Sequence, residues 1–296
     1  MKRRIIALVL LLATILSLCA CSKKNDNSTF SIRFIDVGQG DAALVECDGH
    51  YMLIDGGDTH TVQKLYNVLE EQGIQKLDIL AISHLHTDHF GGLTKALTYA
   101  SSIGITISNS TCADSEAFRK FEHELGINGS KITIPAPGDK YELGSSTVEV
   151  VYSSAESSND SLVLLITYGD TRFLFTGDIE YTTMKKVAEK YQNDGDKPYK
   201  IDLIKVPHHG AKDNDLYEKN ISMYTFLRTF MPDYFIISVG ENNRYDHPHW
   251  HTMEQIEQLV VDAQNLDYSK HVFRTDLDGD IIVRSNGKEL SVETSK

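Results

Sequence analysis

The sequence predicts an α/β protein in which two β-sheets pack face to face and helices cover both outer faces. Short apolar and β-branched segments alternate with segments of helical periodicity along most of the chain. The strands fall into two groups, each with its own helices, and each group is expected to form one sheet. No linker, repeat or low-complexity tract interrupts residues 30–296, so we predict one domain over that range.

Each predicted element follows from a local pattern. Glycines at positions 38, 40 and 49 divide the first apolar stretch into a meander of short strands. Apolar residues recur at helical spacing at 62, 65, 68 and 69, and Gly169-Asp170 predicts a hairpin turn. Strands are expected at 30–37, 42–47, 51–54, 77–83, 147–152, 162–168, 172–175, 201–206, 234–239, 271–274 and 281–284, and helices at 62–72, 91–99, 115–125, 181–191 and 253–261.

The amino-terminal 29 residues are predicted to lie outside the folded domain. Three basic residues precede an apolar run over 5–18, which is followed by Ala20 and Cys21. This order is typical of a bacterial lipoprotein signal, with residues 1–20 as the signal peptide, Cys21 as the lipidated residue and 21–29 as a flexible tether. An ordinary secretory signal is the alternative. Acyl chains on Cys21 would hold the protein at the outer, extracytoplasmic face of the bacterial cell membrane, and no transmembrane domain is expected in the mature chain.

The charge of the chain limits its partners. The formal net charge is −13 at pH 7, and removal of the basic signal peptide makes it more negative. Nucleic-acid binders normally depend on Lys and Arg side chains that neutralise phosphates. The composition therefore argues against a broad basic DNA-binding surface. It does not exclude a nuclease, because bound divalent cations create their own local positive field.

The most informative stretch is His-Leu-His-Thr-Asp-His at 84–89, between a predicted strand and a Gly-Gly turn. A loop at the carboxyl end of a strand can turn several side chains toward one point. Imidazole and carboxylate groups together suit zinc, manganese or iron. The spacing of His84, His86, Asp88 and His89 suits two adjacent ions rather than one, so these four residues are candidate metal ligands.

Two further clusters follow apolar strands. Asp178 comes after the strand 172–175, and one carboxylate can bridge two cations, each of which lowers the pKa of a shared water. His208 and His209 follow the strand 201–206. One of these two histidines could bind metal while the other donates a hydrogen bond or a proton.

Polar residues of two other segments are candidates for supporting roles. His247 is a candidate proton donor, and its neighbours Arg244 and Tyr245 could contact an anionic substrate. Asp55 follows a fully apolar strand, where an unpaired carboxylate is costly to bury. A hydrogen bond from Asp55 to a metal-binding histidine would account for its position.

From residue 30 to about 288 the chain resembles the metallo-β-lactamase fold superfamily, and within it the hydrolase domain of the ComEC/Rec2 family of competence proteins. Eight motifs occur in that family's order, at 34–41, 53–57, 83–92, 159–164, 175–178, 206–210, 243–248 and 275–279. The resemblance implies an αββα four-layer sandwich with two divalent metal ions, zinc or manganese, at the ends of the sheets. The implied metal ligands are His84 and His86 for the first ion, Asp88 and His89 for the second, Asp178 as the bridge, and His209, with His208 beside it, as the late histidine.

The chain departs from the family pattern at three places. Where the superfamily often has a third histidine for the first ion, this sequence has Asn159-Asp160-Ser161. Asn159 or a water would fill that gap, which favours harder ions such as manganese. Asp246 stands where relatives usually have Gly, and Ala211 replaces a common Ser and so removes one phosphate contact.

Together these features predict an extracytoplasmic, lipid-anchored, binuclear metal-dependent hydrolase. Among such hydrolases, they favour a phosphodiesterase. Its candidate catalytic residues are Asp88, His208 and His247. Two anionic substrates stay open: DNA or nucleotides, which the resemblance favours and the charge disfavours, and a teichoic-acid-type phosphodiester of the cell envelope. The alternative is a binding protein rather than an enzyme: a non-catalytic, metal-containing DNA-binding lipoprotein of a competence system.

Overall fold

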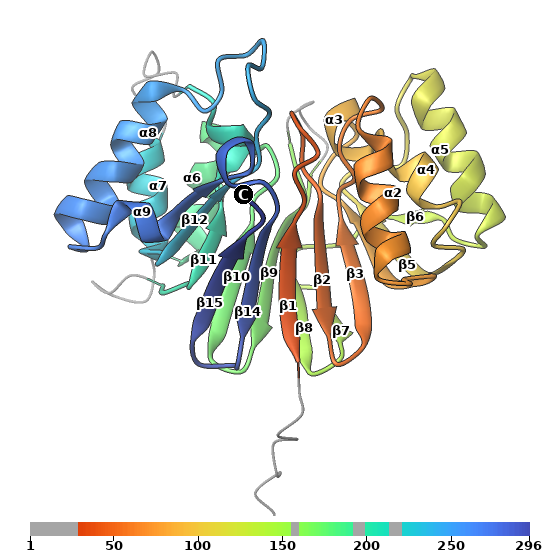
Figure 1. The fold of residues 1–296 in the computed structure, drawn as a ribbon, viewed down its shortest axis with the longest axis horizontal. Coiled ribbons are helices and arrows are strands. Elements are labelled where there is room, and N and C mark those ends of the chain that lie inside the picture. Colours follow the sequence, from red (N-terminus) through yellow and green to blue (C-terminus); the bar gives the residue numbers. More distant parts are fainter. Residues whose placement is uncertain (1–28, 155–159, 192–198, 213–220) are drawn as a thin grey trace, which may run out of the picture.

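A computed structural model describes residues 29–154, 160–191, 199–212 and 221–296 of the chain. Two sheets stand face to face at its centre, and helices lie on the outer side of each (Figure 1). This is the four-layer α/β sandwich that the sequence predicts. The predicted signal peptide, Cys21, nearly all of the predicted tether, and Asn159 lie outside the described residues.

The first sheet has eight strands in the order β15-β14-β1-β2-β3-β4-β5-β6. Strands from β15 to β3 pair antiparallel, and β3 to β6 pair parallel. The carboxyl-terminal hairpin thus completes the sheet that the amino-terminal strands begin. The strands are β1 (Phe30–Phe34), β2 (Ala43–Cys47), β3 (His50–Ile54), β4 (Lys76–Ile82), β5 (Ser102–Ser108), β6 (Ile132–Thr133), β14 (Ile281–Ser285) and β15 (Leu290–Thr294).

The second sheet has seven strands in the order β13-β12-β11-β10-β9-β8-β7. Its hairpin half is antiparallel, and β10 to β13 run parallel, so their carboxyl ends meet at one edge. The strands are β7 (Lys140–Leu143), β8 (Ser146–Tyr152), β9 (Val163–Tyr168), β10 (Thr171–Phe175), β11 (Leu203–Lys205), β12 (Tyr234–Ile237) and β13 (Val272–Arg274).

Helices cover the two sheets separately. The first sheet carries α2 to α5 on one side of the molecule, and the second carries α6 to α9 on the other (Figure 1). The helices are α2 (Val62–Glu71), α3 (Thr87–Phe90), α4 (Leu93–Ala96), α5 (Glu116–Ile127), α6 (Tyr181–Tyr191), α7 (Met223–Phe230), α8 (Trp250–Glu257), α9 (Tyr268–His271) and α10 (Thr275–Asp278), with a 3₁₀ turn η1 (Pro207–Gly210) and a π turn η2 (Gln258–Ala263). In the described part of the chain, no helix has the length and apolar character needed to cross a membrane.

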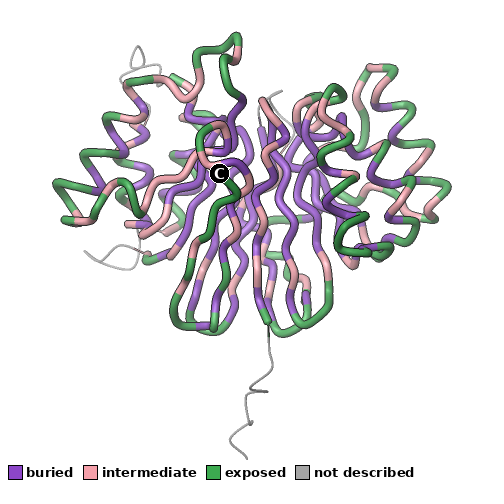
Figure 2. The backbone as a smooth tube through the Cα atoms, in the orientation of Figure 1, coloured by how far each residue is buried: buried purple, intermediate pink, exposed green. Residues whose placement is uncertain are grey.

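Apolar side chains form three layers, one between the sheets and one beneath each set of helices. Burial is concentrated along the strands, as the purple segments in Figure 2 show. Between the sheets, Phe34 of β1 stacks on Phe175 of β10 with ring centroids 5.6 Å apart. Alternation along a strand separates the layers: on β11, Leu203 faces the other sheet and Ile204 faces the helices. This packing fixes the two sheets against each other at the edge where the candidate ligands gather.

The structure corrects one predicted helix and adds elements that the sequence patterns did not indicate. The helix expected at 91–99 is replaced by two short helices, and the first of them already begins at Thr87. Asp88 and His89 therefore lie on a helical turn rather than in a loop, with Asp88 in the first turn, where a carboxylate is favourable. The unpredicted elements are β5, β6, β7, β15, α7, α9 and α10.

Candidate metal centre

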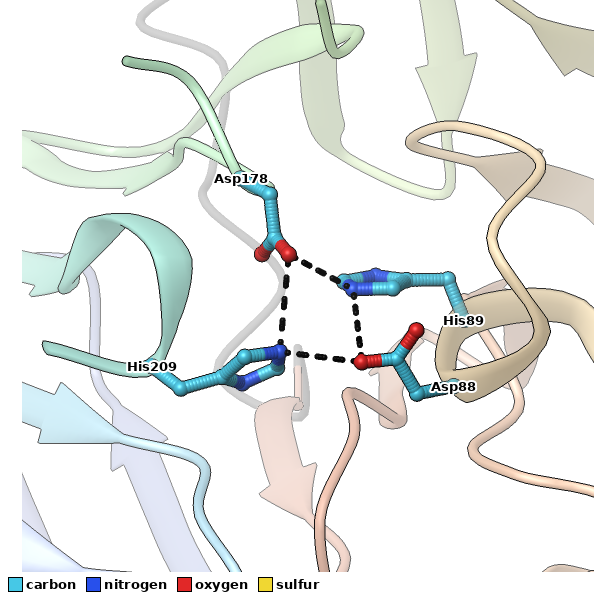
Figure 3. A group of neighbouring side chains, drawn as sticks. All are labelled: Asp88, His89, Asp178 and His209. Carbon is cyan, nitrogen blue, oxygen red and sulfur yellow. Dashed lines mark ion pairs between the residues drawn. The ribbon is translucent and has the colours of Figure 1, made fainter. Parts of the chain in front are cut away.

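All six predicted metal ligands come together at the edge where the two sheets meet. His84 and His86 follow β4, Asp88 and His89 lie on α3, and the first sheet supplies these four. The second sheet supplies Asp178 after β10 and His209 after β11. Figure 3 shows four of these side chains pointing toward one another from opposite sheets. The candidate ligand atoms of Asp88, His89, Asp178 and His209 all lie within 4.8 Å of one another.

One oxygen of Asp178 is the point on which the histidines converge. From Asp178 Oδ2, the Nε2 atom of His89 is 3.2 Å away, that of His209 3.5 Å, that of His208 3.8 Å and that of His84 3.9 Å. The Asp178 backbone amide donates a hydrogen bond to Ser161 Oγ at 2.9 Å, which helps to fix the residue. A carboxylate that faces several imidazoles in this way has the position expected of a bridging ligand.

His89 is oriented by buried hydrogen bonds on its far side. Its Nδ1 atom donates to Asp55 Oδ2 at 2.9 Å, and Asp55 in turn accepts hydrogen bonds from the backbone amide and hydroxyl of Ser83, both at 2.7 Å. With Nδ1 engaged, Nε2 of His89 faces Asp178. Such a carboxylate partner behind a ligand histidine fixes the ring and raises its basicity.

The adjacent histidines on η1 face different surroundings. His209 is buried, donates from Nδ1 to the carbonyl of Ser238 at 2.8 Å, and directs Nε2 toward Asp178 and toward Asp88, whose Oδ2 is 3.5 Å away. The His208 side chain is 29% exposed. Both residues have positive φ values, 51° and 54°, so the chain turns sharply enough to separate their side chains. The geometry therefore favours His209 over His208 as the inward-facing ligand.

His84 and His86 form the other end of the cluster. Nε2 of the buried His84 lies 2.9 Å from Nδ1 of the exposed His86. Ser161 lies beside His84, with its hydroxyl 3.4 Å from His84 Nδ1. Asn159, which with a water was one of two candidates for the place of the missing third histidine, is outside the described residues. Its neighbour Asp160 accepts a hydrogen bond from Thr183 at 2.9 Å.

The donor atoms of this cluster fit divalent cations. In the described part of the chain, His89 Nε2 and His209 Nε2 are buried without a hydrogen-bond partner, an arrangement that buried polar atoms rarely show without a ligand. Imidazole nitrogens and carboxylate oxygens are common ligands of zinc, manganese and iron. The residues present therefore suit one or more such ions.

Without metal, protons on His89 and His209 supply positive charge at the centre in place of metal ions. Burial alone would lower the pKa values of His89 and His209, but the Asp178 carboxylate, with Asp55 beside His89 and Asp41 beside His209, outweighs it. The pKa of His89 lies well above its usual value, and that of His209 rises to about 9. Burial also acts against ionisation of Asp178, yet the charges of His89 and His209 hold its pKa well below the usual range.

An open cleft of about 520 Å³ leads to these residues, and Asp88, Asp178, His208, His209 and His247 line it. Burial and the neighbouring His209 lower the pKa of His208 and bring that of His247 to about 4, so both imidazoles are neutral near pH 7 in the metal-free protein. The rim is aromatic and basic. Tyr245 stacks on His247, with ring centroids 5.6 Å apart, and Arg244 lies over the Tyr245 ring at 4.7 Å.

Comparison with known proteins identifies the family. Residues 35–240 match the metallo-beta-lactamase superfamily. The chain belongs to this superfamily. The predicted resemblance is thus confirmed, and the broad class of the protein is that of a metallo-beta-lactamase superfamily hydrolase.

Within the metallo-beta-lactamase superfamily the chain is similar to competence proteins. It is 27% identical to ComE operon protein 3 of Bacillus subtilis over 87% of this chain and 33% of that protein. It is 29% identical to Recombination protein 2 of Haemophilus influenzae over 90% of this chain and 31% of that protein. The chain therefore spans about a third of the length of these relatives. The metallo-beta-lactamase fold protein YhfI from Bacillus subtilis shares the fold, with a TM-score of 0.53 at 14% identity over 86% of this chain and 100% of that one.

Lys205 of this metallo-beta-lactamase site was not assigned a role from the sequence. Lys205, at the end of β11, is buried, and Asp41, between β1 and β2, lies 2.5 Å from its ammonium. The sequence feature that could have indicated Lys205 is a lysine within an otherwise apolar strand, Leu-Ile-Lys-Val. A buried lysine requires a carboxylate partner.

Proposed function

We propose that this protein is a metal-dependent phosphodiesterase that acts on an anionic substrate outside the cell. The observation that carries the proposal is that the Nε2 atoms of His89 and His209 are buried without a hydrogen-bond partner and both face Asp178, which lines an open cleft together with His209. Two divalent cations, zinc or manganese, held by the six candidate ligands would supply Lewis acidity at a phosphoryl group and a nucleophilic water at neutral pH.

In this proposal the remaining residues of the cleft bind and orient the substrate. His208 and His247 lie on its wall with rings 5.6 Å apart and, when neutral, each can donate one hydrogen bond to a phosphoryl oxygen. An anionic phosphate would raise the pKa of a nearby imidazole, so either histidine could then pass a proton to the leaving oxygen. Asp88, which lies at the cleft and beside His209, would orient the attacking water.

Arg244 and Tyr245 are proposed to contact the substrate beyond the reacting phosphate. Both are exposed, and both line a second cavity of about 560 Å³, which shares Gln39, Thr87, Asp88 and Tyr245 with the cleft. A guanidinium beside an aromatic ring suits a phosphate that carries a planar group.

DNA or a nucleotide is the first candidate substrate. The similarity to ComE operon protein 3 and Recombination protein 2 supports this choice. The net charge of −13 argues against tight binding through a basic surface and requires the metal centre to provide most of the attraction. The predicted lipid anchor at Cys21 supports a second candidate, a teichoic-acid-type phosphodiester of the cell envelope.

The test is phosphodiester hydrolysis by the purified full-length chain. Bis-p-nitrophenyl phosphate is supplied with manganese or with zinc, and metal content is measured on the same samples. A single-stranded oligonucleotide and a poly(glycerol phosphate) are then compared as substrates. Metal-dependent turnover is expected. Binding of metal and DNA without any turnover would instead favour a non-catalytic DNA-binding lipoprotein of a competence system.

A further inference from the structure

Lys205 is a charged residue in the apolar layer between the two sheets. On β11, side chains alternate, so Lys205 lies on the same face as Leu203, which belongs to the core between the sheets. The Lys205 side chain is only 3% exposed. Lysine is almost never buried to this extent unless its charge is compensated, because removing an ammonium from water is costly.

The Lys205 ammonium is surrounded by oxygen atoms. Asp41 Oδ2 lies at 2.5 Å, the carbonyl oxygen of Gly177 at 3.1 Å and Asp178 Oδ1 at 3.7 Å. Asp41 lies between β1 and β2 of the first sheet, whereas Lys205 ends β11 and Asp178 follows β10 of the second, so the ion pair joins the two halves of the sandwich. One oxygen of Asp178 thus faces Lys205 while the other faces the histidines.

A second group of buried ligand atoms lies next to these oxygens, and its residues are not among those that line the open cleft. Ligand atoms of Asp41, Asp55 and His89 lie within 4.8 Å of one another, and all three residues are buried. A cavity of about 20 Å³ between the sheets is lined by Asp41, Asp55, Gly177 and Lys205, and this is room for a single water-sized species. Asp41 Oδ1 is buried, makes no hydrogen bond in the described part of the chain, and lies 3.3 Å from Nδ1 of His209. We name the group Asp41, Asp55 and His89, with the cavity beside it, the inner acidic pocket.

We propose that the ammonium of Lys205 is the resident cation of the inner acidic pocket, and that it keeps a divalent cation out of the layer between the sheets. The pocket offers the oxygen and imidazole ligands that a divalent ion would use, and Lys205 supplies one positive charge at that place. Lys205 is thereby also a positioning residue: it holds Asp178 Oδ1 on the inner side, so that Oδ2 is directed at the histidines. This inference does not depend on the substrate or on the reaction.

Removing the ammonium should convert the inner acidic pocket into a cation site. Lys205→Ala removes one buried positive charge from beside the carboxylates, where His89 and His209 remain, and vacates the space of the lysine stem. A buried carboxylate cluster that loses its cation must gain protons or another cation. In the presence of Mn²⁺, the additional ion is the expected outcome, because manganese accepts carboxylate oxygen and imidazole ligands.

The experiment compares four forms of the full-length chain: wild type, Lys205→Ala, Asp41→Asn/Lys205→Ala, and Lys200→Ala, a change of an exposed lysine paired with Asp233. Bound Mn²⁺ per chain is measured by equilibrium dialysis and elemental analysis, and the unfolding midpoint is followed over a Mn²⁺ titration. Lys205→Ala is expected to bind one more Mn²⁺ than wild type and to gain more thermal stability from it. The double variant and Lys200→Ala are expected to bind the wild-type number.

Equal Mn²⁺ counts in Lys205→Ala and wild type would overturn the proposal. If Lys205→Ala folds only when it is refolded with Mn²⁺, the proposal is supported, since the ion then replaces the lysine. If it does not fold even with Mn²⁺, whereas the charge-matched double variant does, the pocket cannot accept an ion and the proposal fails. Failure of both variants to fold assigns Lys205 a packing role only and also overturns it.

Discussion

At the scale of single residues, the carboxylate of Asp178 lies between two kinds of positive charge. Its Oδ1 atom is 3.7 Å from the Lys205 ammonium, and its Oδ2 atom is 3.2 Å from His89 Nε2 and 3.5 Å from His209 Nε2. Because the side chain is buried, water screens these interactions little. The negative charge of Asp178 is therefore the feature that holds the histidines of both sheets near one point.

Asp178→Asn tests this dependence on charge. Asparagine has nearly the same shape but lacks the negative charge, so we expect loss of the predicted binuclear centre and a fall in metal-dependent turnover by several orders of magnitude, with the fold retained. Metal content, turnover and circular dichroism are measured together. Asp170→Asn, in the exposed turn between β9 and β10, is the matched control and should behave as wild type. Unchanged metal-dependent turnover in Asp178→Asn would contradict the assignment.

The raised pKa values of His89 and His209 predict how the metal-free protein responds to pH. A histidine whose pKa is higher in the folded than in the unfolded state stabilises the fold fully below the unfolded value of about 6.5. That stability is lost as the pH rises through the folded value, which for His209 is about 9. In EDTA, the unfolding midpoint should therefore fall between pH 6.5 and pH 9.

The same measurement with excess Mn²⁺ is the control for this prediction. Metal binding displaces the two histidine protons, so the metal-loaded protein should lose less stability over that range, and apparent metal affinity should increase with pH. A metal-free midpoint that stays constant or rises between pH 6.5 and pH 9 would show that these histidines are not protonated in the folded apoprotein.

At the scale of elements, the site depends on sharp turns at the carboxyl ends of β10 and β11. Gly177 follows β10 with φ +53°, and a Cβ atom there would lie 2.7 Å from Ser161 Oγ and 2.9 Å from Ser83 Cβ. The turn after β10 therefore runs against the turn after β4 without room for a side chain. This close approach brings Asp178 next to the histidines of the first sheet.

Gly177→Ala should destabilise the fold more than an alanine substitution at another glycine with positive φ. Positive φ alone costs an alanine roughly 1–2 kcal/mol, and the clash should add about 1–3 kcal/mol. Gly73→Ala is the control, because Gly73 has φ +68° with nothing within 4 Å of the added Cβ. Urea unfolding measures both variants, and Gly177→Ala should also weaken metal binding by displacing Asp178. Equal destabilisation by the two substitutions would show that the contact with Ser161 and Ser83 is unimportant.

The helices and strands that the sequence predicted are those with a strong local pattern of apolar residues. The buried strands and α6 were predictable from periodicity, since alternation and helical spacing are properties of the segment itself. Strand β5 contains Gly104, which is unfavourable in isolation, and it is stabilised by pairing with β4 and β6. Helix α7 is rich in aromatic and β-branched residues, and its buried apolar face and the Ser222 cap stabilise it instead.

The candidate site shows the same division between local and long-range information. The ligand cluster at 84–89 was visible in the sequence because four ligand types occur within six residues. The pairing of Lys205 with Asp41 was not visible, because the two residues are 164 positions apart and meet only when the sheets pack. Sequence spacing could identify ligands within one turn, but not a counter-charge that the opposite sheet supplies.

At the scale of the whole molecule, the predicted anchor at Cys21 would decide where this hydrolase works. Cys21→Ser should release the protein from the membrane fraction, because serine lacks the thiol that is predicted to carry the lipid. Fractionation of cells and labelling with a radioactive fatty acid measure the change. Cys112→Ser, a substitution of an exposed cysteine within the folded region, is the control and should leave both unchanged. Continued labelling of Cys21→Ser would contradict the predicted lipidation site.

The net charge of the chain predicts that its binding to DNA depends on metal. A chain with net charge −13 repels a polyanion, so binding must come from the metal centre and from the few basic groups near it, such as Arg244. We expect no detectable binding of a cleavage-resistant phosphorothioate oligonucleotide in EDTA at 150 mM salt, and measurable binding once Mn²⁺ is added. Fluorescence anisotropy measures both, with Asp178→Asn as the control that should not respond to Mn²⁺. Tight binding in EDTA that weakens steeply with salt would instead reveal a basic DNA-binding surface, and a receptor rather than an enzyme would then account better for the chain.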